Sequence, residues 1–131
     1  MSKTTITTGE LAQILWRAAE GWTAQTAAIT LLAAHGTWIP RLTGHPDLLL
    51  IDDDEGEPYP YGIDWHKVAA ALAAGQLPGS SSELRILAIA ASLGDSDVPV
   101  RLGDAVTGLD GTNLGLVLQA IATANGRPWA T

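Results

Sequence analysis

The densest group of ionisable side chains in this 131-residue sequence is a run of carboxylates at residues 52–57. Calcium binds about six to eight oxygen ligands, which carboxylates readily supply. The run does not fit an EF-hand calcium loop, because Gly56 at the sixth position would put Ile51 at the first and Gly62 at the twelfth. It predicts a solvated hairpin tip, with a small enzyme or metal-dependent protein built on that tip as an alternative. The run comprises Asp52, Asp53, Asp54, Glu55 and Glu57.

The histidines and nucleophiles show no recognised metal-binding or catalytic spacing. Zinc sites usually contain a closely spaced pair of histidines or cysteines, but no two of His35, His45 and His66 lie within five residues of each other. The chain has no cysteine, which excludes thiolate ligands, disulfides and a cysteine nucleophile. It also lacks the G-x-S-x-G, H-E-x-x-H and phosphate-binding-loop motifs. The sequence thus predicts no bound metal, no cofactor and no catalysis.

The sequence predicts mainly helices as the elements that position these ionisable side chains. Two capping boxes, Thr7 with Glu10 and Ser80 with Glu83, mark helix starts. Apolar residues then recur at helical spacing, and glycine follows where several of these patterns end. The predicted helices span about 7–20, 23–34, 64–74, 80–93, 101–109 and 110–125.

A β-containing segment is predicted at residues 36–63. Trp38-Ile39-Pro40 is expected to be short and extended, and the apolar run at 48–51 predicts a strand. Residues 59–63 alternate in polarity around a proline, which cannot donate to a ladder, so they predict an edge strand. The predicted fold class is therefore mainly α with a small β-hairpin, an α+β arrangement.

The helix at 83–93 is apolar on two opposite sides, with only a narrow polar line at Arg85 and Ser92. Such a helix is buried, either at the centre of this chain or under a partner. Trp16 and Trp129 also favour an interface with a partner, because tryptophan is enriched at binding hot spots. One lies off the apolar stripe of its helix and the other lies near the C-terminus. The predicted interface residues are Trp16, Ile86, Ile89, Leu93 and Trp129.

Other large apolar residues are assigned to the core. Trp22, Trp38 and Trp65 are predicted to lie in the core or at its edge. The last helix has four apolar residues on one face at helical spacing, which is typical of a buried side. They are Leu114, Val117, Leu118 and Ile121.

The order of elements in residues 80–126 resembles a helix-turn-helix: a long helix, a short extended piece, a short helix, a tight turn and a longer helix. The last helix would then read bases through Thr112, Asn113 and Gln119. It contains no lysine or arginine, and the chain has a net charge of −7, whereas nucleic-acid binding depends on basic contacts to phosphate. A nucleic-acid-binding regulator is therefore an alternative, and nucleic acid is not the expected partner.

Composition indicates a single globular domain over residues 1–131. Hydrophobic residues make up 47% of the chain and charged residues 16%, unlike a disordered protein. The sequence shows no signal-peptide pattern and no apolar run of the roughly 20 residues needed to span a bilayer. We therefore expect a cytoplasmic protein without a membrane partner.

Two stretches, Ser81–Gly94 and Val98–Asp110 with Asn113, share a pattern with other sequences. They resemble a region of uncharacterised small proteins from high-GC bacteria and their phages. The similarity extends to Ile63-Asp64-Trp65, Gly75 and Leu77-Pro78, and covers roughly half of the chain. It implies a source, and no activity or site residues.

These observations together predict a non-catalytic protein-interaction or regulatory module. Its expected partner is another protein or a second copy of the chain, which would form a homodimer. The two-sided helix at 83–93 and Trp16 motivate this prediction, along with the absence of catalytic motifs.

Overall fold

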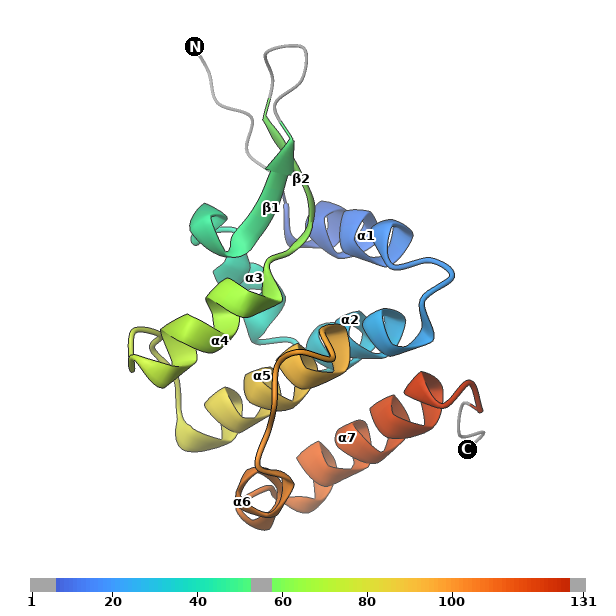
Figure 1. The fold of residues 1–131 in the computed structure, drawn as a ribbon, viewed down its shortest axis with the longest axis vertical. Coiled ribbons are helices and arrows are strands. Elements are labelled where there is room, and N and C mark those ends of the chain that lie inside the picture. Colours follow the sequence, from blue (N-terminus) through green and yellow to red (C-terminus); the bar gives the residue numbers. More distant parts are fainter. Residues whose placement is uncertain (1–6, 53–57, 128–131) are drawn as a thin grey trace.

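A computed structural model describes residues 7–52 and 58–127 of the chain. In these residues the fold is mainly helical with one two-stranded antiparallel hairpin, as predicted (Figure 1). No helix in them is long and apolar enough to cross a lipid bilayer. The elements in chain order are α1 (Thr8–Ala18), α2 (Thr23–His35), α3 (Trp38–Leu42), a 3₁₀ turn η1 (Pro46–Leu48), β1 (Leu49–Asp52), β2 (Tyr59–Ile63), α4 (Trp65–Ala73), α5 (Ser81–Gly94), α6 (Leu102–Thr107) and α7 (Gly111–Ala124).

Both predicted capping boxes are confirmed. At α1 the Glu10 backbone N–H donates to Thr7 Oγ1 at 3.1 Å, and the Thr7 N–H donates back to Glu10 Oε1 at 2.9 Å. At α5 the same pair of bonds joins Ser80 and Glu83, at 3.2 and 2.9 Å. Each box satisfies backbone donors that a helix start leaves without an intrahelical partner, and such a cap contributes about 1 kcal/mol.

The hairpin also matches the sequence prediction. Leu49 pairs with Ile63 and Asp52 with Tyr59, with a register shift beside Leu50. Proline at residue 60 is tolerated because a two-stranded sheet has only edge strands. The hairpin extends away from the helices at one end of the molecule (Figure 1).

The prediction that Trp38-Ile39-Pro40 is extended is wrong, because these residues begin α3. Pro40 is the third residue of this helix, where its missing N–H would have had no intrahelical acceptor. The segment therefore accepts a helical conformation despite its proline. Trp38, Ile39 and Leu42 become buried as a result.

Helix α5 is the central helix of the fold. It packs against α2, α4, α6 and α7, which surround it in Figure 1. Ile86 and Ile89 are fully buried by these neighbours, and Leu93 is half-buried. The predicted use of Ile86 and Ile89 as a partner surface is therefore wrong, since other helices of the same chain cover them. The buried apolar residues of all seven helices form one core cluster.

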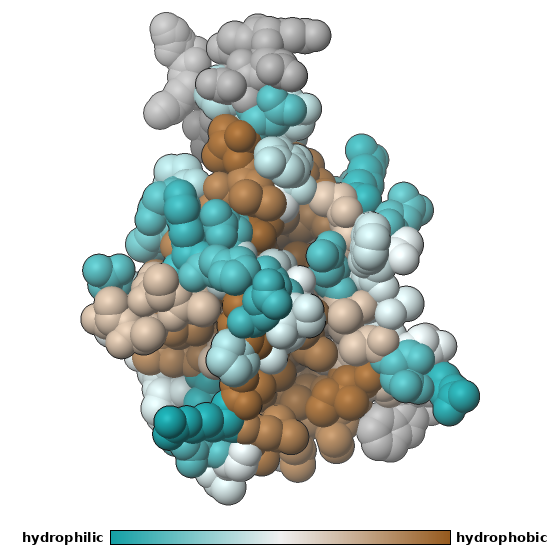
Figure 2. Space-filling view, in the orientation of Figure 1, coloured by the Kyte–Doolittle hydropathy of each residue, from teal (hydrophilic) through white to brown (hydrophobic). Residues whose placement is uncertain are grey.

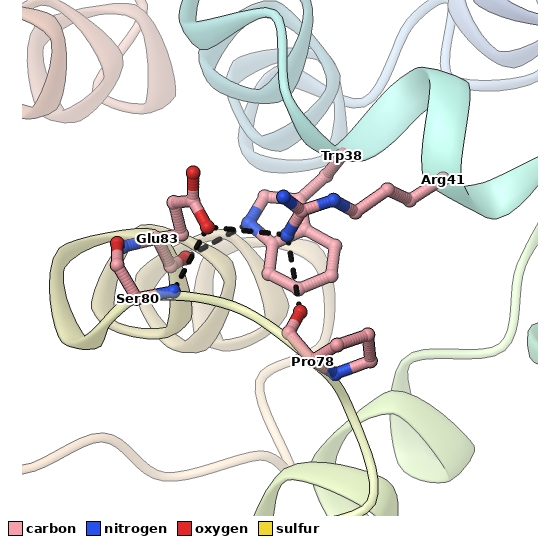
Figure 3. A network of polar contacts seen from close by, with 5 residues as sticks. All are labelled: Trp38, Arg41, Pro78, Ser80 and Glu83. Atoms are coloured by element: carbon pink, nitrogen blue, oxygen red, sulfur yellow. Dashed lines mark hydrogen bonds and ion pairs between the residues drawn. The ribbon is translucent and has the colours of Figure 1, made fainter.

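A network of polar contacts joins the beginning of α5 to α3 (Figure 3). The Trp38 indole donates from Nε1 to the Glu83 carbonyl at 2.8 Å. The Arg41 guanidinium, 5.0 Å from the Trp38 ring centroid, donates to Glu83 Oε1 at 3.2 Å and to the Pro78 carbonyl at 3.0 Å. Glu83 also accepts from the Ser80 N–H, so the polar groups here have partners within the chain. We call these contacts the Trp38 network. They orient α5 relative to α3.

Candidate functional site

Three large apolar residues of α7 are exposed in the described part of the chain. Leu114, Leu118 and Ile121 are 39%, 39% and 44% exposed. Val117, on the same helix, is 1% exposed, and Ala120 is also buried. The predicted common face is therefore split: Val117 enters the core, and the other three large residues remain outside it.

Helix geometry places the three exposed residues in one stripe. Residues four and seven positions after Leu114 return to the same side of a helix with 3.6 residues per turn. Leu118 and Ile121 occupy those positions. The stripe lies beside the buried face, so α7 has a wider apolar arc than the rest of the chain covers. We call Leu114, Leu118 and Ile121 the α7 stripe.

Two exposed glycines flank the α7 stripe. Gly111 and Gly115 precede Leu118 by seven and three residues, which puts them on its side of the helix. A Cβ added to either glycine would meet nothing within 4 Å, so open space lies above both. Small residues four apart allow the backbones of two helices to approach closely. The face thus combines large apolar side chains with two neighbouring positions that carry no side chain.

Charge is absent from α7. Residues Gly111–Ala124 contain no aspartate, glutamate, lysine or arginine, although the chain as a whole has a net charge of −7. In Figure 2 brown, apolar side chains gather in the lower part of the view, over α7. Depletion of charged residues is typical of the centre of a protein–protein interface. Helix α7 thus combines exposed apolar side chains with an absence of charged residues.

The core anchors α7 firmly on its other side. It packs against α2 and α5 through Val117 and Ala120. Asp110 caps its start by accepting from the Asn113 N–H at 2.8 Å, and Thr23 on α2 donates to the Ala124 carbonyl at 3.0 Å near its end. Both ends of the helix are thereby held, and the α7 stripe is presented on a fixed element.

The predicted base-reading residues lie on the same helix. Thr112 and Gln119 are exposed, and Asn113 is half-buried at the capped start. The structure adds no basic residue to α7 that would contact phosphate. A helix-turn-helix function for residues 80–126 stays a prediction that the fold does not confirm.

The exposure of the tryptophans differs in part from the sequence prediction. Trp16 is partly exposed on α1 and donates from Nε1 to Thr30 Oγ1 on α2 at 3.3 Å. Trp22 is 66% exposed at the N-cap position of α2, so the prediction that it lies in the core or at its edge is wrong. Trp38 and Trp65 are buried, as predicted. Trp129 lies outside the described residues.

Most of the acidic run also lies outside the described residues, namely Asp53, Asp54, Glu55 and Glu57. Asp52 is at the end of β1, where its Oδ2 accepts from the Tyr59 hydroxyl at 3.4 Å. The predicted metal or enzymatic role of this run stays a prediction.

A cleft of about 1040 Å³ lies at the opposite end of α5 from the Trp38 network. The turn before α2, the strand β2, the start of α4 and the end of α5 form its walls, with Trp22, Tyr61 and Trp65 among the lining residues. His66 and Asp95 line it as well, with His66 Nε2 3.0 Å from Asp95 Oδ2. These two residues are far apart in the sequence, so no local motif indicated that they meet.

No protein-family model matches the chain, and no curated protein or solved structure is similar to it at a significant level.

Proposed function

We propose that this protein is a non-catalytic interaction module that self-associates through α7. The observation that carries the proposal is the α7 stripe, an exposed apolar row on a helix without a single charged residue. The burial of apolar surface is the main favourable term in protein association. This proposal moves the predicted interface from α5 to α7.

The chemistry of the surface favours a second copy of the chain as its occupant. Two copies of a net acidic protein repel each other at most surfaces, but two α7 helices bring no charges together. A two-fold symmetric contact requires one patch that is complementary to itself. The large side chains of the α7 stripe and the open positions at Gly111 and Gly115 lie on one face, so side chains of one copy could pack over the glycines of the other.

The test is sedimentation equilibrium of the full chain over a range of concentrations. We expect the unmodified protein to dimerise and Leu118→Glu to sediment as a monomer, because a carboxylate would be buried without a partner in the interface. Leu118 is exposed in the single chain, so the substitution should leave the fold intact, which circular dichroism checks.

Ile51→Glu is the matched control, because it also replaces an exposed apolar residue with a carboxylate but lies on β1, at the opposite end of the molecule from α7 (Figure 1). It should dimerise normally. A wild-type protein that stays monomeric at every concentration would overturn the proposal, and so would a Leu118→Glu variant that dimerises as tightly as the wild type. Ile121→Glu provides a second variant at the same stripe.

A further inference from the structure

We propose that His66, Asp95 and Asp97 form a binding site for a divalent transition-metal ion such as Zn²⁺. Each residue offers one ligand atom, and these atoms all lie within 4.8 Å of one another. The site is remote from α7, so the inference goes beyond the proposed self-association and does not depend on it.

The ligand set suits this class of ion. Imidazole nitrogen is a common ligand for zinc and related metals, and carboxylate oxygen completes many such sites. Metal–ligand distances are about 2.0–2.2 Å, so the three atoms must move slightly closer together around an ion. Because His66 and Asp97 are exposed, their side chains have the freedom to do so.

Packing between two helices creates the site. Trp65 at the start of α4 lies directly against Gly94, the last residue of α5, where an added Cβ would overlap the indole ring. His66 follows this tryptophan and Asp95 follows this glycine, so the contact brings the two side chains together. The side chain of Asp64 holds the start of α4 by accepting from the Lys67 N–H at 3.2 Å.

Asp95 is oriented as a metal ligand would be. Its Oδ1 accepts from the Asp97 backbone N–H at 2.8 Å, which leaves Oδ2 directed at His66 Nε2, 3.0 Å away. Hydrogen bonds that fix the orientation of a ligand are a regular feature of metal sites. The same turn places the Asp97 carboxylate next to the other two groups.

The electrostatics of the site favour a cation. The C-terminal end of a helix carries partial negative charge, which stabilises cations and disfavours anions. Asp95 is the C-cap of the 14-residue helix α5, and Asp97 follows two residues later. In the described part of the chain, His66 is the one basic residue within ion-pair distance of Asp95. A divalent cation would offset the partial negative charge at the end of α5 and the repulsion between the two carboxylates.

Three protein ligands leave at least one coordination position open, as in zinc sites that bind water or a substrate. His66 and Asp95 also line the cleft of about 1040 Å³. A small ligand in the cleft can therefore reach an ion at this site.

Isothermal titration calorimetry of ZnCl₂ into the full chain without an affinity tag tests the proposal. We expect saturable binding of one ion, and a loss of affinity of at least about tenfold in His66→Ala and in Asp97→Asn. Both side chains are exposed, so neither change removes core packing.

The control is the double variant His45→Ala, Asp47→Asn, which removes another histidine and aspartate two residues apart. It should bind Zn²⁺ as the wild type does, because these residues do not belong to the cluster. The proposal is overturned if the wild type does not bind Zn²⁺, if the His66 and Asp97 variants keep wild-type affinity, or if the control loses affinity equally.

Discussion

Helices α5 and α7 are both 14 residues long, and both are rich in apolar residues, yet the fold uses them in opposite ways. Helix α5 is surrounded by four other helices, and its two apolar sides are buried within the chain. Helix α7 packs against α2 and α5 on one side, while Leu114, Leu118 and Ile121 remain exposed. How much of an apolar helix is buried therefore depends on how many other elements pack around it in the tertiary structure.

The charged residues distinguish the two helices better than the apolar ones do. Helix α5 contains Glu83 and Arg85, whereas α7 has no charged residue. In α5 a charged group joins the Trp38 network and orients a central helix. In α7 the exposed polar side chains, such as Thr112 and Gln119, are uncharged and lie beside the α7 stripe.

The two helices should differ most when one large residue on each is truncated to alanine. Ile86→Ala should lower the free energy of unfolding by about 2–5 kcal/mol, because it leaves a cavity in the core. Leu118→Ala should change it by less than about 1 kcal/mol, because Leu118 is already partly exposed in the single chain. Urea unfolding at low protein concentration measures both values. Equal losses would contradict the conclusion that α5 is central and that the α7 stripe is exposed.

A glycine substitution on each helix gives the next largest effect. Gly94→Ala should destabilise the protein by about 1–3 kcal/mol, because the new methyl group would overlap the Trp65 ring. Gly115→Ala should stabilise the single chain by roughly 0.5–1 kcal/mol, because its position in the helix is open and alanine favours helix. Thermal unfolding at low concentration would show opposite shifts in Tm. A destabilising effect of Gly115→Ala would mean that the α7 face is already covered within the chain.

The smallest effect concerns pH at the start of α5. The Ser80 backbone N–H, and then Arg41, hold the pKa of Glu83 below its ordinary value. Its contribution to stability is therefore present above the pKa of an unfolded glutamate, about 4.3, and is lost as the pH falls through the lower folded value. Glu83→Gln should lower stability at neutral pH, and the gap to the wild type should close in acid. Urea unfolding at several pH values measures this difference in stability. A difference that does not change with pH would contradict the stabilising role of the Glu83 carboxylate.

Local features of the chain were sufficient to predict most of the elements. The two capping boxes, the helical spacing of apolar residues and the alternation at 59–63 depend on neighbours in the sequence, and each marked a real helix or strand. The error at Trp38-Ile39-Pro40 has a local cause too, because a proline is compatible with the first turn of a helix as well as with an extended segment.

The placement of surfaces was decided by the tertiary structure. Periodicity defines the apolar arc of a helix, but the number of helices that pack around it depends on contacts between residues distant in sequence. The isoleucines of α5 were therefore assigned to an interface, while the leucines of α7 were assigned to the core. The meeting of His66 with Asp95 was also unpredictable, because it depends on how closely α4 approaches the end of α5 at Gly94. The local sequence determined most of the helices, and the packing of those helices decided which side chains remain exposed, because burial depends on contacts between residues distant in the chain.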